Sequence, residues 1–191
     1  MNRSGIVLAG GASRRFGGDK LAEPVGGISL LERAVQALAG VVDEILVVVG
    51  PNGRAPVPGL SDREGLRIVG DREPFGGPVA GIQAGLLAAR GELVLVVGGD
   101  MPSLVPDVLD LLAESAPAAL ADSAGVVRPL PCAFDRAAGI VLADELLAGG
   151  ERRLRTLLAR LGARAVPWSE WQPRDPAGAT LVDIDERGDL P

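Results

Sequence analysis

The sequence predicts a single α/β domain spanning residues 1–191, with a doubly wound, mainly parallel sheet and helices on both faces. Short apolar runs alternate with segments in which apolar residues recur at helical spacing. The runs are apolar at nearly every position, which is typical of strands that are covered on both faces. Repeated strand–helix–strand units favour a parallel sheet, and no linker or internal repeat divides the chain.

The first part of the chain supplies three strands and one helix. Residues 6–8 form the first predicted strand. The segment Ser29-Leu30-Leu31-Glu32 is a capping box that starts a helix, and this helix ends near Gly40. Residues 44–49 and 66–69 are β-branched, apolar runs and form the next two strands.

The second part continues the alternation. Gly77-Pro78 opens a helix, because proline suits the first turn, and Gly91 ends it. Residues 93–97 form another buried strand, and Pro106 starts the following helix. The remaining elements are strands at 118–121, 128–134 and 180–184 and helices at 135–147 and 151–161.

The composition excludes several kinds of chemistry. The chain has no histidine, which removes imidazole bases, histidine triads and most zinc sites. Cys132 is the only cysteine, so an internal disulfide and a cysteine metal cluster are excluded. The net charge of −6 and the lack of tyrosine argue against binding nucleic acid or an anionic membrane. Catalysis is left to Asp, Glu, Lys, Arg, backbone amides and a hard metal ion.

The same features predict a cytoplasmic location. No apolar stretch reaches 18 residues without Gly, Pro or charge, so we expect no membrane span. The beginning of the sequence lacks the small-residue cleavage pattern of a signal peptide.

The loop after the first predicted strand is the segment most informative about function. Residues 8–20 read LAGGASRRFGGDK, with four glycines, two adjacent arginines and a closing lysine. Glycines let backbone amides approach a phosphate, and Arg15 and Lys20 supply the countercharge. The loop is not a Walker A motif, because Leu21 follows Lys20, and it lacks the Gly-x-Gly-x-x-Gly fingerprint. The sequence therefore predicts a phosphate-binding loop of another type.

Aspartates follow two other predicted strands. Ligands of an open parallel sheet bind beyond the carboxyl ends of its strands, so Asp71 and Asp100 should meet the glycine-rich loop in one crevice. Asp100 can hold Mg²⁺ while the metal also binds a nucleotide phosphate. The alternative for Asp100 is a cap on the helix that begins at Pro106, or a bond to turn amides. The neighbouring phosphate loop favours the metal.

Two further pairs of charged residues have weaker signals. Asp183 and Asp185 would point to the same side of an extended segment, and either could complete a metal site, although from the spacing alone an ordinary strand-end turn is the better explanation. Arg152 and Arg153 begin a predicted helix, where the helix dipole disfavours cations. This placement suggests that they bind an anion such as the phosphate of an acceptor.

Three other residues have ordinary explanations. Cys132 fits a small core residue. Trp168 and Trp171 lie in the polar stretch 167–178, which we expect to be a surface excursion of the same domain. The two tryptophans either cover the core or line a cleft, and the sequence leaves both open.

The ordered motifs of the chain resemble those of the MobA-like nucleotidyltransferases, and among these the molybdenum cofactor guanylyltransferases. The segment Leu8-Ala9-Gly10-Gly11-x-Ser13-x-Arg15-Phe16-Gly17-x-Asp19-Lys20 is similar to the family signature. The further matches are Asp71 and residues 77–82, 99–102, 150–153, 183–185 and 189–190. The resemblance spans nearly the whole chain and implies a nucleotide-diphospho-sugar transferase-like fold.

The resemblance implies a nucleotide site at the first loop. Leu8, Ala9 and Gly10 would contact the nucleotide through their backbone, and Gly11 would contribute with the other loop amides on the phosphates. Lys20 would bind the triphosphate and act in catalysis.

Other strand ends would complete the site. Asp71 would help position the nucleoside, and Asn52 occupies the place of a polar contact after the second strand. Asp100 would ligate catalytic Mg²⁺, with Asp185 as a second metal ligand. Arg15 would join Lys20 in neutralising charge on the phosphates.

Some positions depart from the family pattern. Asp183 and Asp185 stand where asparagines are usual, and residues 128–132 lack a histidine that many guanylyltransferases carry there. The Gly10-Gly11 pair favours guanylyl over cytidylyl members. These departures leave the acceptor and the base preference open.

The function implied is Mg²⁺-dependent transfer of GMP from GTP to molybdopterin, or a related phosphorylated acceptor, with release of pyrophosphate. Proteins that deliver molybdopterin would be partners. The alternatives are a cytidylyltransferase or another nucleotidyltransferase with a different acceptor, or a non-catalytic nucleotide-binding regulator. The acceptor phosphate is ionised at neutral pH, so the reaction needs no strong general base, which suits a chain without histidine.

Overall fold

The structure is a computed structural model that describes residues 2–10, 20–50, 57, 60, 63–71 and 76–189. Its strands are β1 (Arg3–Leu8), β2 (Pro24–Val25), β3 (Ile28–Ser29), β4 (Glu44–Val49), β5 (Leu66–Gly70), β6 (Leu93–Gly98), β7 (Ala118–Ala121), β8 (Val127–Asp135) and β9 (Arg164–Val166). Its α-helices are α1 (Leu30–Ala39), α2 (Gly77–Ala88), α3 (Pro106–Glu114), α4 (Arg136–Ala148), α5 (Leu154–Arg160) and α6 (Trp168–Trp171). Within the described ranges, no helix has the length and apolar character needed to cross a membrane.

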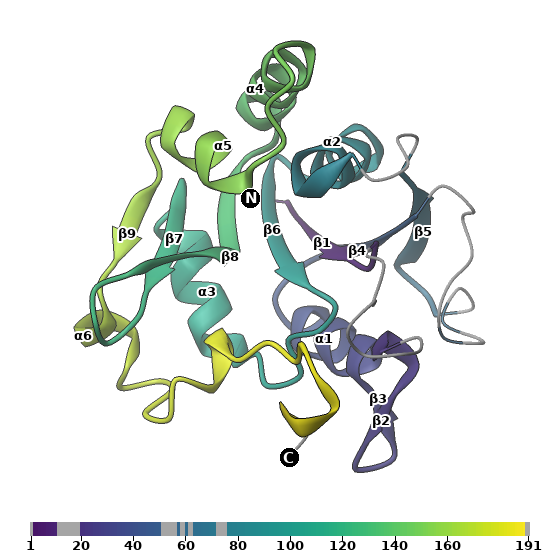
Figure 1. Cartoon of the computed structure of the whole chain (residues 1–191), viewed down its shortest axis with the longest axis vertical. Helices are drawn as coiled ribbons and strands as arrows, with labels where there is room; N and C mark the ends of the chain where they lie inside the picture. Colours follow the sequence, from purple (N-terminus) through teal and green to yellow (C-terminus); the bar gives the residue numbers. More distant parts are fainter. Residues whose placement is uncertain are drawn as a thin grey trace.

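Seven strands form one sheet in the order β5-β4-β1-β6-β8-β7-β9, and β2 pairs with β3 in a separate hairpin. Among the described strands of the large sheet, β8 alone runs antiparallel to its neighbours. Helices cover both faces (Figure 1). The predicted doubly wound, mainly parallel α/β fold is confirmed.

Two hydrophobic layers explain why the strands are apolar at almost every position. Val7 of β1 and Leu95 of β6 pack with α1 and α3 on one face of the sheet. Their neighbours Ile6 and Val94 pack with α2, α4 and α5 on the other face. Successive side chains of a strand point to opposite faces, so a strand between two helical layers has no polar side.

The capping box at the start of α1 is present as predicted. The Ser29 hydroxyl accepts a hydrogen bond from the amide of Glu32 (3.2 Å), and the Glu32 carboxylate accepts one from the amide of Ser29 (3.2 Å). The hydrogen bond from the Ser29 hydroxyl (2.8 Å) and the nearby Arg63 hold the pKa of Glu32 below its ordinary value. The helix therefore begins where the sequence predicted.

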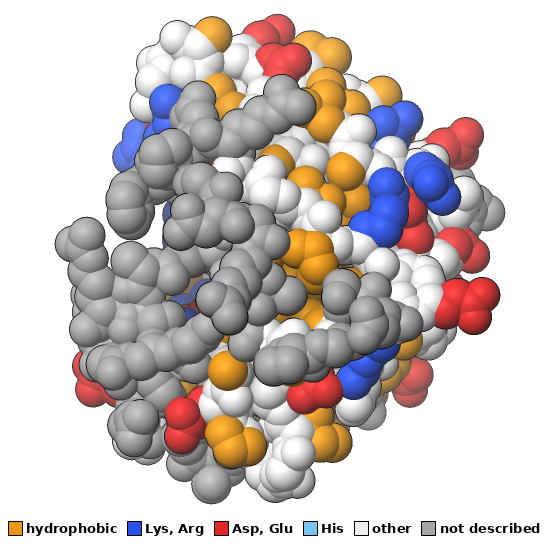
Figure 2. All heavy atoms as spheres, turned by 90° about the vertical axis from the view of Figure 1, so that its right-hand side faces the viewer, with side chains coloured by type: hydrophobic (Ala, Val, Ile, Leu, Met, Phe, Trp, Pro, Cys, Tyr) orange, Lys and Arg blue, Asp and Glu red, His pale blue; other side chains and the backbone are white. Residues whose placement is uncertain are grey.

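A half-buried carboxylate joins three strands and the segment after α2 at the amino end of the sheet. Glu44 accepts hydrogen bonds from the Ser4 hydroxyl (2.7 Å), the Arg90 amide (2.6 Å) and the Arg67 guanidinium (2.6 Å). Burial would raise the pKa of Glu44, but these hydrogen bonds outweigh it and lower the pKa. Elsewhere on the surface, basic and acidic side chains also lie side by side, as the face in Figure 2 shows.

The predicted strand at residues 180–184 is wrong. Ala179–Leu181 is a 3₁₀ helix, and the backbone after it is irregular. The Asp175 carboxylate accepts hydrogen bonds from the amides of Ala179 (3.1 Å) and Thr180 (2.7 Å), so these amides are not available to a strand partner. The sequence also did not predict β9 or the β2–β3 hairpin, which have three and two residues per strand.

The helix predicted at 151–161 is shorter than expected. Helix α5 begins at Leu154, because the Glu151 side chain binds the amides of Arg152 (2.8 Å) and Arg153 (3.0 Å) before the helix starts. Arg152 and Arg153 therefore precede the helix.

Trp171 belongs to the core. Its ring is fully buried, its Nε1 donates a hydrogen bond to the Ala121 carbonyl (2.9 Å), and Trp168 packs edge-on at a centroid distance of 4.3 Å. The sequence left open whether the tryptophans cover the core or line a cleft, and Trp171 packs in the core. Cys132 is also a buried core residue, and burial raises the pKa of its thiol.

Candidate active site

The sheet reverses its strand order between β1 and β6. The chain adds β4 and β5 on one side of β1, then crosses back to place β6 on its other side. The amide of Gly99, just after β6, donates a hydrogen bond to the carbonyl of Leu8 at the end of β1 (3.0 Å). The carboxyl ends of two strands at such a reversal are where open α/β sheets bind ligands.

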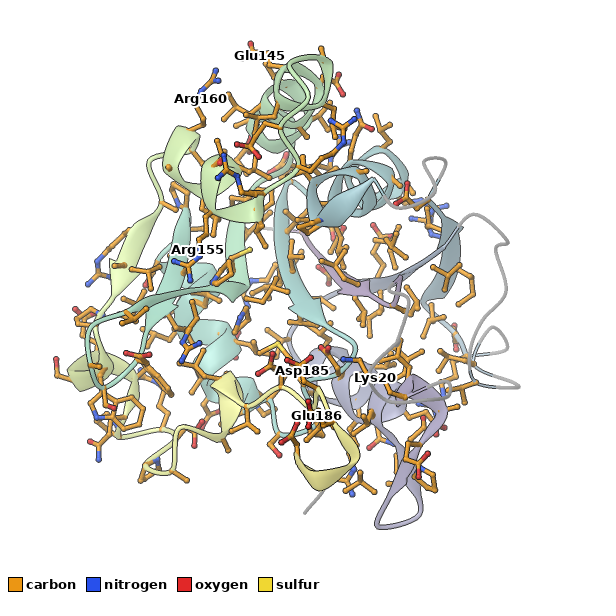
Figure 3. The ribbon with its side chains drawn as sticks, in the orientation of Figure 1. Lys20, Glu145, Arg155, Arg160, Asp185 and Glu186 are labelled. Atoms are coloured by element: carbon orange, nitrogen blue, oxygen red, sulfur yellow. The ribbon has the colours of Figure 1, made fainter. Side chains whose placement is uncertain are left out.

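Lys20 lies at this reversal. It starts the short 3₁₀ helix Lys20–Ala22, which the buried side chain of Leu21 anchors. The Lys20 Nζ donates hydrogen bonds to Asp100 Oδ2 (2.7 Å) and to the Ile184 carbonyl (2.9 Å). Asp185 Oδ1 lies 3.5 Å from the same Nζ (Figure 3). Three distant parts of the chain therefore meet at one ammonium group.

Two glycines place Asp100. A Cβ on Gly98 would lie 2.5 Å from Asp100 Oδ1, and a Cβ on Gly99 would lie 3.2 Å from the Leu8 carbonyl oxygen. Any larger residue at these positions would push the carboxylate or the strand end away. The Gly-Gly-Asp sequence at the end of β6 thus has a steric reason.

The segment that carries Asp185 is fixed by its own contacts. The amide of Ile184 donates to the Asp100 carbonyl (3.0 Å), and the Ile184 side chain is buried against Leu30. The Asp189 carboxylate accepts hydrogen bonds from the amides of Asp185 (3.0 Å) and Glu186 (2.8 Å). These contacts bring Asp185 to Lys20, although Asp185 stays more exposed than Asp100 (60% against 28%).

The other predicted nucleotide contacts gather around the ends of β1, β4 and β5. The amide of Ala9 donates to the Val48 carbonyl (2.7 Å), and the amide of Asp71 donates to the Val49 carbonyl (2.8 Å). A Cβ on Gly81 of α2 would lie within 4 Å of both Leu8 and Asp71 Oδ2. Leu8, Ala9 and Asp71 are therefore close neighbours.

Gly10 approaches the backbone after β4, because a Cβ on it would lie 3.5 Å from the Gly50 nitrogen. The predicted contacts Gly11, Arg15 and Asn52 lie outside the described residues.

Arg153 has an anionic partner within the chain, the carboxylate of Glu151. The Arg153 guanidinium binds both oxygens of Glu151 (2.6 and 2.9 Å), and Arg152 donates to the Leu147 carbonyl (3.0 Å). The Arg153 hydrogen bonds lower the pKa of Glu151 well below its ordinary value and raise that of Arg153. Glu151 therefore supplies a local anion for Arg153, and the binding of an external anion by the two arginines stays a prediction.

The donor set suits a magnesium ion that is also held by a nucleotide. No group of three or more metal-binding side chains occurs in the part of the chain that the structure describes. The carboxylates of Asp100 and Asp185 both face the Lys20 ammonium. Mg²⁺ commonly takes one or two carboxylates and completes its shell with phosphate oxygens and water. The pair therefore fits such a metal, but not a metal site built from protein ligands alone.

The family model of the MobA-like NTP transferase domain matches residues 5–166. The chain belongs to this family. Its resemblance to MobA-like nucleotidyltransferases is thereby confirmed. MobA-like NTP transferases are enzymes, as the sequence motifs implied.

Individual relatives are similar over most of their length. A probable molybdenum cofactor guanylyltransferase of Chloroflexus aggregans is 34% identical, and the match covers 100% of this chain and 92% of the relative. The molybdenum cofactor guanylyltransferase of Rhodobacter capsulatus is 39% identical, with coverages of 88% and 85%.

Solved structures share the fold. The molybdopterin-guanine dinucleotide biosynthesis protein A of Archaeoglobus fulgidus superposes with a TM-score of 0.79 at 24% identity, covering 98% of this chain and 94% of that one. A 2-C-methyl-D-erythritol 4-phosphate cytidylyltransferase of Thermus thermophilus has a TM-score of 0.67 at 21% identity, with coverages of 97% and 94%. Both comparisons support the doubly wound α/β fold of this chain.

Sequence reasoning missed two contacts, of which only the first had no signal in the sequence. The Ile184 carbonyl accepts a hydrogen bond from Lys20, and a carbonyl carries no residue-type signature. The pairing of Glu151 with Arg153 was readable from the sequence, since oppositely charged residues so close together before a helix can form an ion pair.

Proposed function

We propose that this chain transfers GMP from GTP to molybdopterin, with Mg²⁺, and releases pyrophosphate. The proposal is supported by relatives with that name that match most of the chain at 34% and 39% identity. The observation that carries it is the meeting of Lys20, Asp100 and Asp185 where the strand order reverses. This arrangement combines a cation for phosphates with carboxylates for a metal.

The chemistry requires charge control more than proton transfer. An oxygen of the acceptor phosphate attacks the α-phosphorus of GTP and forms the new P–O bond. The bond between the α-phosphorus and the bridging oxygen breaks, and pyrophosphate leaves with that electron pair. When bound, Mg²⁺ neutralises charge on the triphosphate.

The residues of the chain have separate tasks in this reaction. Lys20 binds the triphosphate, and Asp100 and Asp185 hold the metal. The backbone of Leu8, Ala9 and Gly10 positions the nucleotide, as the family resemblance implies. Positioning and charge neutralisation then provide the catalysis.

The remaining assignments rest on the resemblance. Asp71 positions the nucleoside, and its place beside Leu8 and Gly81 supports that role. Gly11 and Arg15 contact the phosphates, and Asn52 contributes a polar contact. Proteins that deliver molybdopterin are the partners that the resemblance implies.

A nucleotide panel tests the donor. We expect GTP with Mg²⁺ to raise the Tm by several degrees more than CTP, UTP or ATP, because a ligand that binds only the folded state stabilises it by mass action. A larger shift with CTP would favour the cytidylyl alternative.

Pyrophosphate release tests the reaction. Release should require GTP, Mg²⁺ and molybdopterin together. GTP binding without release in the presence of molybdopterin would favour a different acceptor or the regulatory alternative.

A further inference from the structure

The ammonium of Lys20 lies between the two carboxylates proposed to hold the metal. It contacts Asp100 Oδ2 at 2.7 Å and the Ile184 carbonyl oxygen at 2.9 Å, with Asp185 Oδ1 at 3.5 Å. An ammonium has three N–H donors, and here three oxygens surround it. Only 15% of the Lys20 side chain is exposed, so the group is held inside the site rather than in solvent.

We propose that Lys20 holds the metal position in the nucleotide-free enzyme and leaves it when a nucleoside triphosphate binds. This inference rests on the proposed function, because it concerns the same metal ligands. A divalent cation bound by Asp100 and Asp185 would lie where the ammonium now lies, and two cations repel each other at such distances. The metal and the nucleotide must then bind interdependently.

The nucleotide provides the partner that draws Lys20 away. A triphosphate offers several anionic oxygens, whereas in the free enzyme the ammonium has two carboxylates and a carbonyl. When Lys20 moves to the phosphates, both carboxylates lose their countercharge and attract a divalent cation. Thermodynamic linkage requires that the nucleotide raises the affinity for the metal by the same factor as the metal raises the affinity for the nucleotide.

The local structure allows this movement without unfolding. Leu21 is buried and holds the backbone of the 3₁₀ helix Lys20–Ala22. The Lys20 side chain can therefore turn on its flexible four-carbon stem while its backbone stays fixed. The carboxylates are anchored separately, through the turn after β6 and through the hydrogen bonds of Asp189.

Direct binding of Mn²⁺, followed by the electron paramagnetic resonance of the free ion, tests the inference. The comparison uses the wild type, Lys20→Met, which keeps the length without the charge, and Lys20→Arg, which keeps the charge. Arg160→Met is the matched control. It removes an exposed ion pair with Glu145 (2.6 Å) that lies at the opposite end of the molecule (Figure 3).

Without nucleotide, Lys20→Met should bind Mn²⁺ about tenfold or more tightly than the wild type. Lys20→Arg and Arg160→Met should bind Mn²⁺ as weakly as the wild type does. Adding GTP should tighten Mn²⁺ binding to the wild type strongly and to Lys20→Met much less. Equal Mn²⁺ affinities of wild type and Lys20→Met without nucleotide would overturn the inference while leaving the proposed function intact.

Failure of the proposed metal site gives a different pattern. If Mn²⁺ binds neither protein with GTP present, the assignment of Asp100 and Asp185 fails, and the inference with it. A second measurement follows the lysine ¹⁵Nζ signal of the wild type by NMR. The Lys20 signal should shift on addition of Mg²⁺ with GTP, and stay unchanged with Mg²⁺ alone at the same concentration. A shift of that signal with Mg²⁺ alone would contradict the proposed exchange.

Discussion

The amide of Gly99 donates a hydrogen bond to the carbonyl oxygen of Leu8, and this bond joins the ends of the two strands between which the sheet order reverses. The next residue, Asp100, binds Lys20 through its side chain and Ile184 through its carbonyl. One turn therefore connects the sheet, Lys20 and the C-terminal segment.

Asp100→Asn should abolish turnover and leave the fold intact. The change keeps the shape of the side chain but removes the charge that would hold the metal, so we expect the rate of pyrophosphate release to fall about 100-fold or more. The Tm should change by only a few degrees, because the carboxylate is partly exposed. Asp110→Asn is the matched control, since it breaks an ion pair with Arg3 elsewhere and should keep full turnover. Retained turnover of Asp100→Asn with Mg²⁺ and GTP would rule out the metal assignment.

Gly91→Ala should destabilise the protein. A Cβ at this position would lie 2.7 Å from the backbone nitrogen of Ser4, and a backbone atom of β1 cannot turn aside as a side chain can. We expect a loss of about 1–3 kcal/mol in the free energy of unfolding, measured by urea titration. In Gly40→Ala the new Cβ meets nothing within 4 Å, so stability should change by no more than about 0.5 kcal/mol. Equal stability of the two variants would contradict this packing.

Glu44 should make the protein sensitive to acid. Its pKa is lower in the folded state than its ordinary value of 4.5, so its contribution to stability is fully present above that value and is lost as the pH falls below it. Glu44→Gln should therefore be less stable than the wild type by about 1–3 kcal/mol at pH 7. Urea titrations from pH 7 to pH 3.5 should show this difference narrowing. A constant difference would argue against the role of the carboxylate charge.

Trp171→Phe should lower stability more than Trp168→Phe. Loss of the indole N–H leaves the buried Ala121 carbonyl without this hydrogen bond, which costs about 1–3 kcal/mol. Trp168 is only partly buried, so its replacement by another aromatic ring should cost less. Thermal unfolding followed by fluorescence compares the two variants, and a larger loss in Trp168→Phe would contradict the assignment of Trp171 to the core.

Most of the sheet was predictable because its strands are buried on both faces. A run such as residues 93–97 is apolar at every position, and burial between helices is the reason. The strand predicted at 180–184 failed because Thr180 follows Asp175, whose carboxylate binds backbone amides and forms a turn. Apolar residues in that segment pack singly, as Ile184 does on Leu30, rather than as part of a sheet.

The candidate site was predictable in its residue types but not in its contacts. The rule that ligands bind at strand ends correctly selected Lys20 and Asp100 as neighbours. The position of Asp185 depends on the Asp189 carboxylate and on the burial of Ile184, which are tertiary contacts without a periodic signal. The sequence analysis inferred an external anion for Arg153 because the helix dipole disfavours cations at the start of a helix. It did not consider the nearby Glu151, whose carboxylate forms an ion pair with Arg153.

The hydrogen bond between Lys20 and the Ile184 carbonyl spans 164 residues of sequence. Contacts between residues so far apart close the largest loops and form slowly during folding. Helices and neighbouring strands should therefore assemble first in a refolding experiment, and the capacity to bind a nucleotide should return after the far-ultraviolet circular dichroism has recovered. Between these two events, we expect the chain to have its native content of secondary structure but no enzymatic activity.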